Sequence, residues 1–71
     1  TGLDLRDREL ITLTAIMCLG GCEPQLKAHT AANLSVGNSK QDLIDTIMVA
    51  MPYIGFPRTL NALAVVNEIA K

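Results

Sequence analysis

Glycine and proline divide this chain into four segments of helical length. Gly20 and Gly21 interrupt the sequence first, and Gly37 interrupts it again. A third break follows at 51–57, where two prolines, a glycine and both aromatic side chains lie within seven residues. Glycine readily takes the left-handed conformation that ends helices, and proline fits the first turn of a helix, where its missing N–H costs nothing. We therefore predict four helices joined by short turns.

The local sequence predicts where each helix begins and ends. We expect helices over about 5–19, 24–36, 40–51 and 57–71. Asp4 and Ser39 are expected N-caps, and Ser39 with Asp42 fits a capping box. Pro52 should kink or end the third helix. No strand pattern or internal repeat is present, so the predicted fold class is a compact all-α bundle of about four helices in one domain, 1–71, which could be the C-terminal part of a longer domain.

Apolar residues are too numerous for so short a chain to hide. They make up 49% of the sequence, with only 3% aromatic, and they cover nearly the whole circumference of the segment 10–19, which indicates a first helix buried on most sides. The three methionines, at 17, 48 and 51, read as core. A chain of this size buries only about 60% of the surface that its unfolded form exposes. We therefore predict a homo-oligomer, or a fragment of a larger helical domain.

Charge and hydropathy exclude several classes of partner. The formal net charge is −1, and no basic run is longer than 6–8, so nucleic acid is not an expected partner. The longest apolar run, 15–19, is too short to span a bilayer, and no signal-peptide pattern opens the chain. The expectation is a cytoplasmic protein without membrane contact, in which the two cysteines are free thiols or a reversible redox pair.

Cys22 is the leading candidate for a catalytic group. It lies where the second helix should begin, and the partial positive charge of a helix N-terminus favours a thiolate. The alternative is a small apolar residue buried in a turn. Cys18 lies four residues earlier and could resolve an oxidised Cys22 only if the backbone bends between them; otherwise it packs in the core.

His29 is the second candidate, seven residues after Cys22. It is the one side chain here whose unperturbed charge changes near neutral pH, so acid–base catalysis competes with a structural role. Two cysteines and one histidine lack a fourth zinc ligand, and we expect no metal. Glu9 could support proton transfer or simply be solvated.

Three further side chains are expected near a substrate. Tyr53, with Phe56, should wall a pocket or a subunit contact. Arg58, just after Pro57, could bind a carboxylate, although it could also be solvated at a helix start.

Several stretches, taken in order, resemble a known family. They read Leu-Arg-Asp-Arg-Glu-Leu-Ile-Thr-Leu, a Gly-Gly break, Gln-Leu-Lys-Ala-His, Asp-Leu-Ile-Asp, Pro-Tyr-Ile-Gly-Phe-Pro and Leu-Asn-Ala. This order resembles the carboxymuconolactone decarboxylase family of the alkylhydroperoxidase D-like superfamily, over essentially all 71 residues. The resemblance implies an all-α fold, assembly as trimers or hexamers, and further helices before this segment in complete members.

The resemblance implies two possible chemistries. Peroxidase-type members use Cys-x-x-Cys, then His after three more residues, and an upstream Glu that assists proton transfer. Counted back from His29, the first family cysteine falls on Cys22 and the second on Gln25, and Glu9 lies one residue from the family glutamate. Lactone decarboxylase-type members need no cysteine and act on a small carboxylated lactone through polar groups around the same His, without a cofactor.

Three functional hypotheses follow, each with a small-molecule substrate or none and no cofactor. The first is a thiol-dependent oxidoreductase with peroxiredoxin activity, in which Cys22, His29, Cys18 and Glu9 are catalytic. The second is a lyase in which His29 is the acid–base group and Arg58 anchors the substrate carboxylate. The third is a non-catalytic oligomeric module. For either enzyme, we expect the substrate-binding side chains to be those of Gln25, Tyr53 and Arg58.

Overall fold

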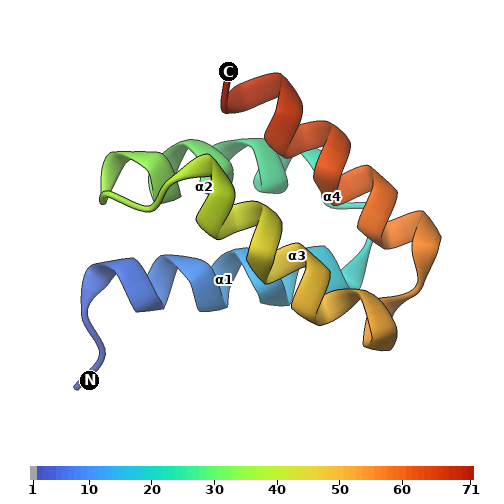
Figure 1. Ribbon diagram of the computed structural model, residues 1–71, viewed down its shortest axis with the longest axis horizontal. Coiled ribbons are helices and arrows are strands. Elements are labelled where there is room, and N and C mark those ends of the chain that lie inside the picture. The colour runs from blue at the N-terminus through green and yellow to red at the C-terminus, as the bar shows by residue number, and fades with distance from the viewer. Residues whose placement is uncertain (1) are drawn as a thin grey trace.

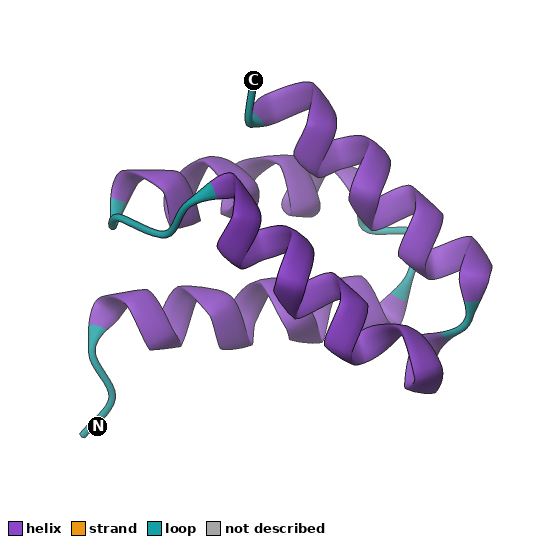
Figure 2. Cartoon of the chain, viewed as in Figure 1, coloured by secondary structure: helices purple, strands orange, loops and turns teal. Residues whose placement is uncertain are grey.

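The structure is a computed structural model that describes residues 2–71 and consists of four helices. The helices are α1 (Leu5–Leu19), α2 (Glu23–Ser35), α3 (Lys40–Ile54) and α4 (Phe56–Ile69). Figure 1 shows α1 and α2 running in opposite directions, with α3 and α4 crossing them as a second pair (Figure 1). No strand is present within residues 2–71, and only short turns join the helices (Figure 2). The predicted all-α fold is therefore confirmed.

The helix starts follow from side chains that accept backbone hydrogen bonds. The Asp4 carboxylate accepts from the Asp7 backbone N–H at 2.9 Å, which caps α1. At α3, the Ser39 hydroxyl accepts from the Asp42 N–H, and the Asp42 carboxylate accepts from the Ser39 N–H at 2.8 Å. This is the capping box that the sequence predicts, with Asp in place of the usual Glu.

A single apolar core joins all four helices. Helix α2 packs against α1 and α4, and α3 packs against α4 and α1. The buried apolar side chains come from α1 (Leu13, Met17), α2 (Leu26), α3 (Leu43, Ile47, Ala50) and α4 (Ala62, Val65, Val66), with Ala70 just beyond. The core therefore fixes how α1 and α2 lie against each other, and this contact positions the candidate site.

The prediction that α1 is buried on most sides is wrong for the single chain. Ile11 is 55% exposed and Leu19 is 70% exposed, because the other helices cover only part of the circumference of α1. Met48, expected in the core, is 39% exposed, whereas Met17 is buried as predicted. Apolar periodicity shows which residues avoid water but not what covers them.

Pro52 does not end α3, which continues to Ile54. Pro52 cannot donate a hydrogen bond to the Met48 carbonyl, and only two helical residues follow it. Gly55 then ends α3 with φ +82°, and α4 begins directly at Phe56.

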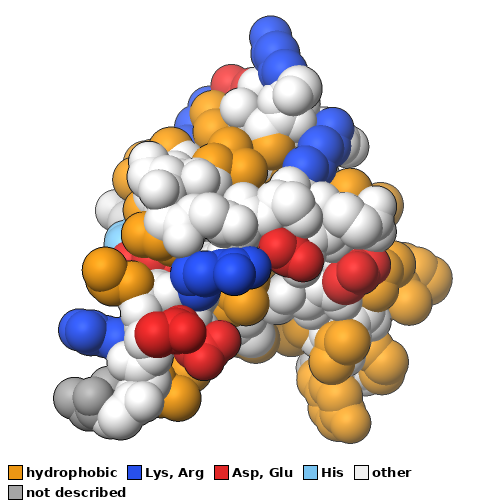
Figure 3. Space-filling view, turned by 60° about the vertical axis from the view of Figure 1, so that its left-hand side comes forward, with side chains coloured by type: hydrophobic (Ala, Val, Ile, Leu, Met, Phe, Trp, Pro, Cys, Tyr) orange, Lys and Arg blue, Asp and Glu red, His pale blue; other side chains and the backbone are white. Residues whose placement is uncertain are grey.

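Large apolar side chains remain on the surface. Figure 3 shows apolar side chains spread over one face of the molecule beside clusters of acidic and basic groups (Figure 3). The exposed set is Leu3, Leu5, Ile11, Leu19, Met48, Val49, Tyr53, Phe56 and Leu60. Within residues 2–71, none of the four helices combines the length and the apolar character that crossing a membrane requires.

Candidate active site

A carboxylate and an imidazole meet between the two antiparallel helices α1 and α2. Glu9 Oε1 lies 3.0 Å from His29 Nδ1, although the residues are twenty positions apart in the chain. We call Glu9 and His29 the carboxylate–imidazole pair. Their side chains are 21% and 36% exposed, so a small molecule can reach the imidazole while the carboxylate is largely shielded from water.

This contact determines which imidazole nitrogen can act as a base. An ionised carboxylate only accepts hydrogen bonds, so Nδ1 of His29 must carry the proton in the contact. In the neutral imidazole, Nε2 then has a free lone pair and can accept a proton. The pair thus has the arrangement of a general base that is oriented by a second group.

The backbone beneath the pair is held by a buried asparagine that the sequence analysis missed. Asn33 is completely buried, and its Nδ2 donates to the His29 carbonyl at 2.8 Å and to the Glu9 carbonyl at 3.1 Å. Its Oδ1 accepts from Asn38 Nδ2 at 2.9 Å. We call Asn33 and Asn38 the amide network. The sequence signal was the spacing of four residues between His29 and Asn33, which places both on one helix face.

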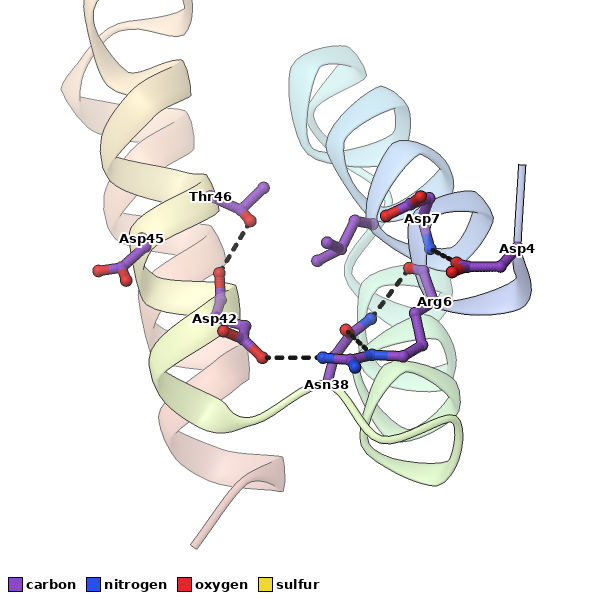
Figure 4. A pocket seen from close by; sticks show the side chains of 8 residues that line it. Asp4, Arg6, Asp7, Asn38, Asp42, Asp45 and Thr46 are labelled. Carbon is purple, nitrogen blue, oxygen red and sulfur yellow. Dashed lines mark hydrogen bonds and ion pairs between the residues drawn. The ribbon is translucent and has the colours of Figure 1, made fainter. Parts of the chain in front are cut away.

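The amide network extends to the surface at the start of α1. Asn38 Nδ2 also donates to the Arg6 carbonyl at 3.0 Å, and Arg6 Nε donates to Asn38 Oδ1 at 3.2 Å (Figure 4). Arg6 Nη2 lies 3.9 Å from the Asp42 carboxylate, across a polar hollow of about 390 Å³. Hydrogen bonds from the Ser39 backbone and then its side chain lower the pKa of Asp42, and the charge of Arg6 adds to this effect.

Cys22 lies at the N-cap of α2, as expected. Its side chain does not cap the helix, and Sγ instead donates to the Gly20 carbonyl at 3.4 Å, a weak hydrogen bond. The thiol is partly buried. The sulfur therefore faces a backbone carbonyl oxygen and makes no hydrogen bond to the N–H groups at the start of α2.

Cys22 and His29 lie on the same helix without touching. Seven helical residues separate their backbone positions by about 10 Å along the axis. Within residues 2–71, no hydrogen bond joins the sulfur to the imidazole. A bound water or the substrate would have to carry a proton between them.

Cys18 is exposed, so the expectation that it packs in the core is wrong, and both cysteines are free. Together with Tyr53, the exposed Cys18 lines an apolar hollow of about 410 Å³ between α1 and α3. Thr14, Thr46, Val49 and Ala50 complete the lining. The described part of the chain contains no group of three or more His, Cys, Asp or Glu residues that could hold a metal ion.

Arg58 lies against the turn that precedes Cys22. It is on the first turn of α4, and a Cβ atom added to Gly20 would lie 2.7 Å from Arg58 Nε. Gly20 has φ +73° and ψ 157°, a conformation that is essentially restricted to glycine. The Arg58 side chain therefore lies beside Gly20, two residues before Cys22. Gln25 is exposed on the first turn of α2, and Tyr53 is 87% exposed.

Comparison with known proteins gives a family and a relative. The model of the carboxymuconolactone decarboxylase family matches residues 1–68. An uncharacterized 15.0 kDa protein in the nqo9-nqo10 intergenic region of Paracoccus denitrificans is 32% identical over 69 residues. The match covers 96% of this chain and 52% of the relative, so the chain spans about half the length of that curated protein. No solved structure matches.

Proposed function

Because the chain belongs to the carboxymuconolactone decarboxylase family, we propose that it is a thiol-dependent oxidoreductase of the peroxidase type. Membership of the family supports a place in the alkylhydroperoxidase D-like superfamily. The observation that carries the proposal is the 3.0 Å contact between Glu9 of α1 and His29 of α2, the helix whose N-cap is Cys22. Such an oriented base is what activation of a thiol requires.

The proposed reaction begins with removal of the Cys22 proton. Because Cys22 and His29 do not touch, bound water or the substrate carries this proton to His29 Nε2, and the negative carboxylate of Glu9 stabilises the imidazolium that forms. The thiolate then attacks the outer oxygen of a hydroperoxide, so an S–O bond forms while the O–O bond breaks. The alkoxide leaves with the proton that His29 returns. The products are a sulfenic acid on Cys22 and an alcohol.

A second thiol closes the cycle. It attacks the sulfur of the sulfenic acid, a disulfide forms and water leaves. Cys18 is one source of this thiol, and an external small thiol is the other. Cys18 faces the hollow between α1 and α3, so reaching Cys22 requires the turn at Gly20 and Gly21 to move.

A cofactor-free lyase is the second candidate, and the position of Arg58 favours it. A guanidinium beside Gly20 could bind the carboxylate of a small lactone. The C–C bond to that carboxylate would break, CO2 would leave, and the imidazole of the carboxylate–imidazole pair would give a proton to the carbon that remains, with no part for either cysteine. Gln25 and Tyr53 are further candidates for substrate contact in both reactions.

Assembly into a homo-oligomer, as a trimer or hexamer, is part of the proposal. Val49 is 74% exposed and Tyr53 is 87% exposed, both line the apolar hollow between α1 and α3, and contiguous apolar surface of this kind is typical of interaction sites. We propose that copies of the chain bury this surface and that the substrate is a small molecule.

The test is peroxide consumption, with an external thiol as reductant, by the wild type and three single variants. Cys22→Ser should abolish turnover, and His29→Ala should reduce it about 10²-fold. Cys18→Ser should retain the first turnover and accumulate sulfenic acid if Cys18 resolves it. Loss of lactone decarboxylation in His29→Ala but not in Cys22→Ser would support the lyase instead. Full peroxide turnover by Cys22→Ser would refute the first proposal.

A further inference from the structure

We propose that Asn33 is a positioning residue, which sets α1 against α2 so that Glu9 meets His29. This inference rests on the function proposed above, because it concerns the same carboxylate–imidazole pair. The two hydrogens of one buried amide are donated to the backbone carbonyls of the two residues whose side chains form the pair. One rigid group therefore ties together the backbone positions from which both functional side chains extend.

Helix geometry explains why the pair needs a group such as Asn33, which we call the clamp, to fix α1 against α2. A shift of one residue along α1 moves a side chain by about 1.5 Å along the axis and turns it by about 100°. The 3.0 Å contact would not survive that change. Apolar packing between α1 and α2 resists separation of the helices, but it is not directional. Hydrogen bonds from a planar amide to two carbonyls are directional and select one arrangement.

Asn38 fixes the orientation of the clamp. An amide could turn over and present Oδ1 to the two carbonyls, where it would repel them. Asn38 Nδ2 donates to Asn33 Oδ1 at 2.9 Å, so the oxygen already has its partner on the opposite side. Asn38 is itself held by the Arg6 carbonyl and by Arg6 Nε. The amide network thus runs from a surface arginine to the backbone under the site, and among the described residues no buried side-chain polar atom lacks a partner.

The experiment measures which nitrogen of neutral His29 carries the proton. The full chain is labelled with ¹⁵N, and the imidazole nitrogen shifts are recorded at a pH where the ring is neutral. Contact with Glu9 should make the Nδ1–H form dominant in the wild type. Asn33→Ala should release the two backbones, so that the hydrogen bond between His29 and the charged Glu9 is lost. The ratio of Nδ1–H to Nε2–H should then fall about ten-fold, the change expected when one hydrogen bond to a charged group is lost.

Thr30→Ala is the matched control. Thr30 is equally buried on the same helix, but its hydroxyl donates to the Leu26 carbonyl within α2 and is hydrogen-bonded to neither member of the pair. It should lose stability in a urea titration and keep the wild-type tautomer ratio. If Asn33→Ala does not fold, Asn38→Ala is measured, because it removes the group that orients the clamp, and its ratio should fall in the same direction.

The outcomes separate this inference from the proposed function. A wild type without the Nδ1–H preference would contradict the carboxylate–imidazole pair and with it the basis of the proposed chemistry. A wild-type preference that persists in folded Asn33→Ala or Asn38→Ala would overturn only the positioning role. A ten-fold fall that also occurs in Thr30→Ala would show a general effect of destabilisation and would likewise overturn it.

Discussion

The close approach of Arg58 to Gly20 makes a quantitative prediction about the turn before Cys22. Gly20→Ala places a side chain on a backbone with φ +73° and ψ 157°, which costs about 1–3 kcal/mol for a residue other than glycine. The new Cβ would also lie 2.7 Å from Arg58 Nε, so Arg58 must move. Because Arg58 is solvent-exposed, we expect this rearrangement to add about 1 kcal/mol, the cost of an unfavourable rotamer.

Gly21→Ala is the control for a positive φ without a neighbouring side chain. Gly21 also has a positive φ, +69°, but a Cβ added there would meet no atom within 4 Å. Urea unfolding should therefore show a loss of stability for both variants and a larger loss for Gly20→Ala. A chain of this length shifts in Tm by roughly 4–8 °C for each kcal/mol, so thermal unfolding should resolve the difference.

A double-mutant cycle isolates the contact. In an Arg58→Ala background, Gly20→Ala should cost only the backbone strain, which gives a coupling of about 1 kcal/mol between the two sites. Equal losses for Gly20→Ala and Gly21→Ala, together with a coupling near zero, would refute the conclusion that Arg58 is held along this turn. The role of Arg58 as an anchor for an anionic substrate would then lose its structural support.

Three other predictions concern the fold and its assembly. The pKa of Asp42 is lowered chiefly by the Ser39 backbone hydrogen bond. The stabilisation from the ionised carboxylate is therefore complete above the unfolded pKa of about 3.9 and is lost as pH falls through the folded pKa. Below about pH 4, the free energy of urea unfolding should fall less steeply with falling pH for Asp42→Asn than for the wild type. Leu43 is 0% exposed, so Leu43→Ala should cost about 2–5 kcal/mol in urea unfolding, and a loss below about 1 kcal/mol would contradict its place in the core. Val49→Asp should dissociate the proposed homo-oligomer in sedimentation velocity, whereas an unchanged sedimentation coefficient would place the interface elsewhere.

The helix ends could be predicted because local chemistry sets them. Asp4 and Gly20 bound α1 where the sequence predicts, and Ser39 with Asp42 forms the predicted capping box. The end of α3 near Pro52 was not predicted correctly, because the effect of a proline depends on how much of the helix follows it. A proline in the last turn removes one bond and leaves the helix otherwise intact.

The candidate site was only partly predictable. The family resemblance pointed to Glu9 and His29, but the contact between them depends on how α1 and α2 pack, which no local pattern encodes. Asn33 and Asn38 were missed because a single asparagine in a helix or turn usually faces water. Their hydrogen bonds span 24 and 32 residues, so only the tertiary structure brings these groups together. The exposure of Met48 was missed because it, too, depends on how the helices pack.

The position of Pro52 has a consequence for any protein that covers α3. Proline cannot donate to the carbonyl four residues earlier, so the Met48 oxygen lacks its usual helical donor. Met48 is 39% exposed and the neighbouring Val49 is 74% exposed, so the side chains around this carbonyl present apolar surface to solvent. A subunit that covers α3 and donates an N–H or O–H hydrogen bond to the Met48 carbonyl would bind in one orientation. Apolar contacts alone would leave its orientation free, because they are not directional.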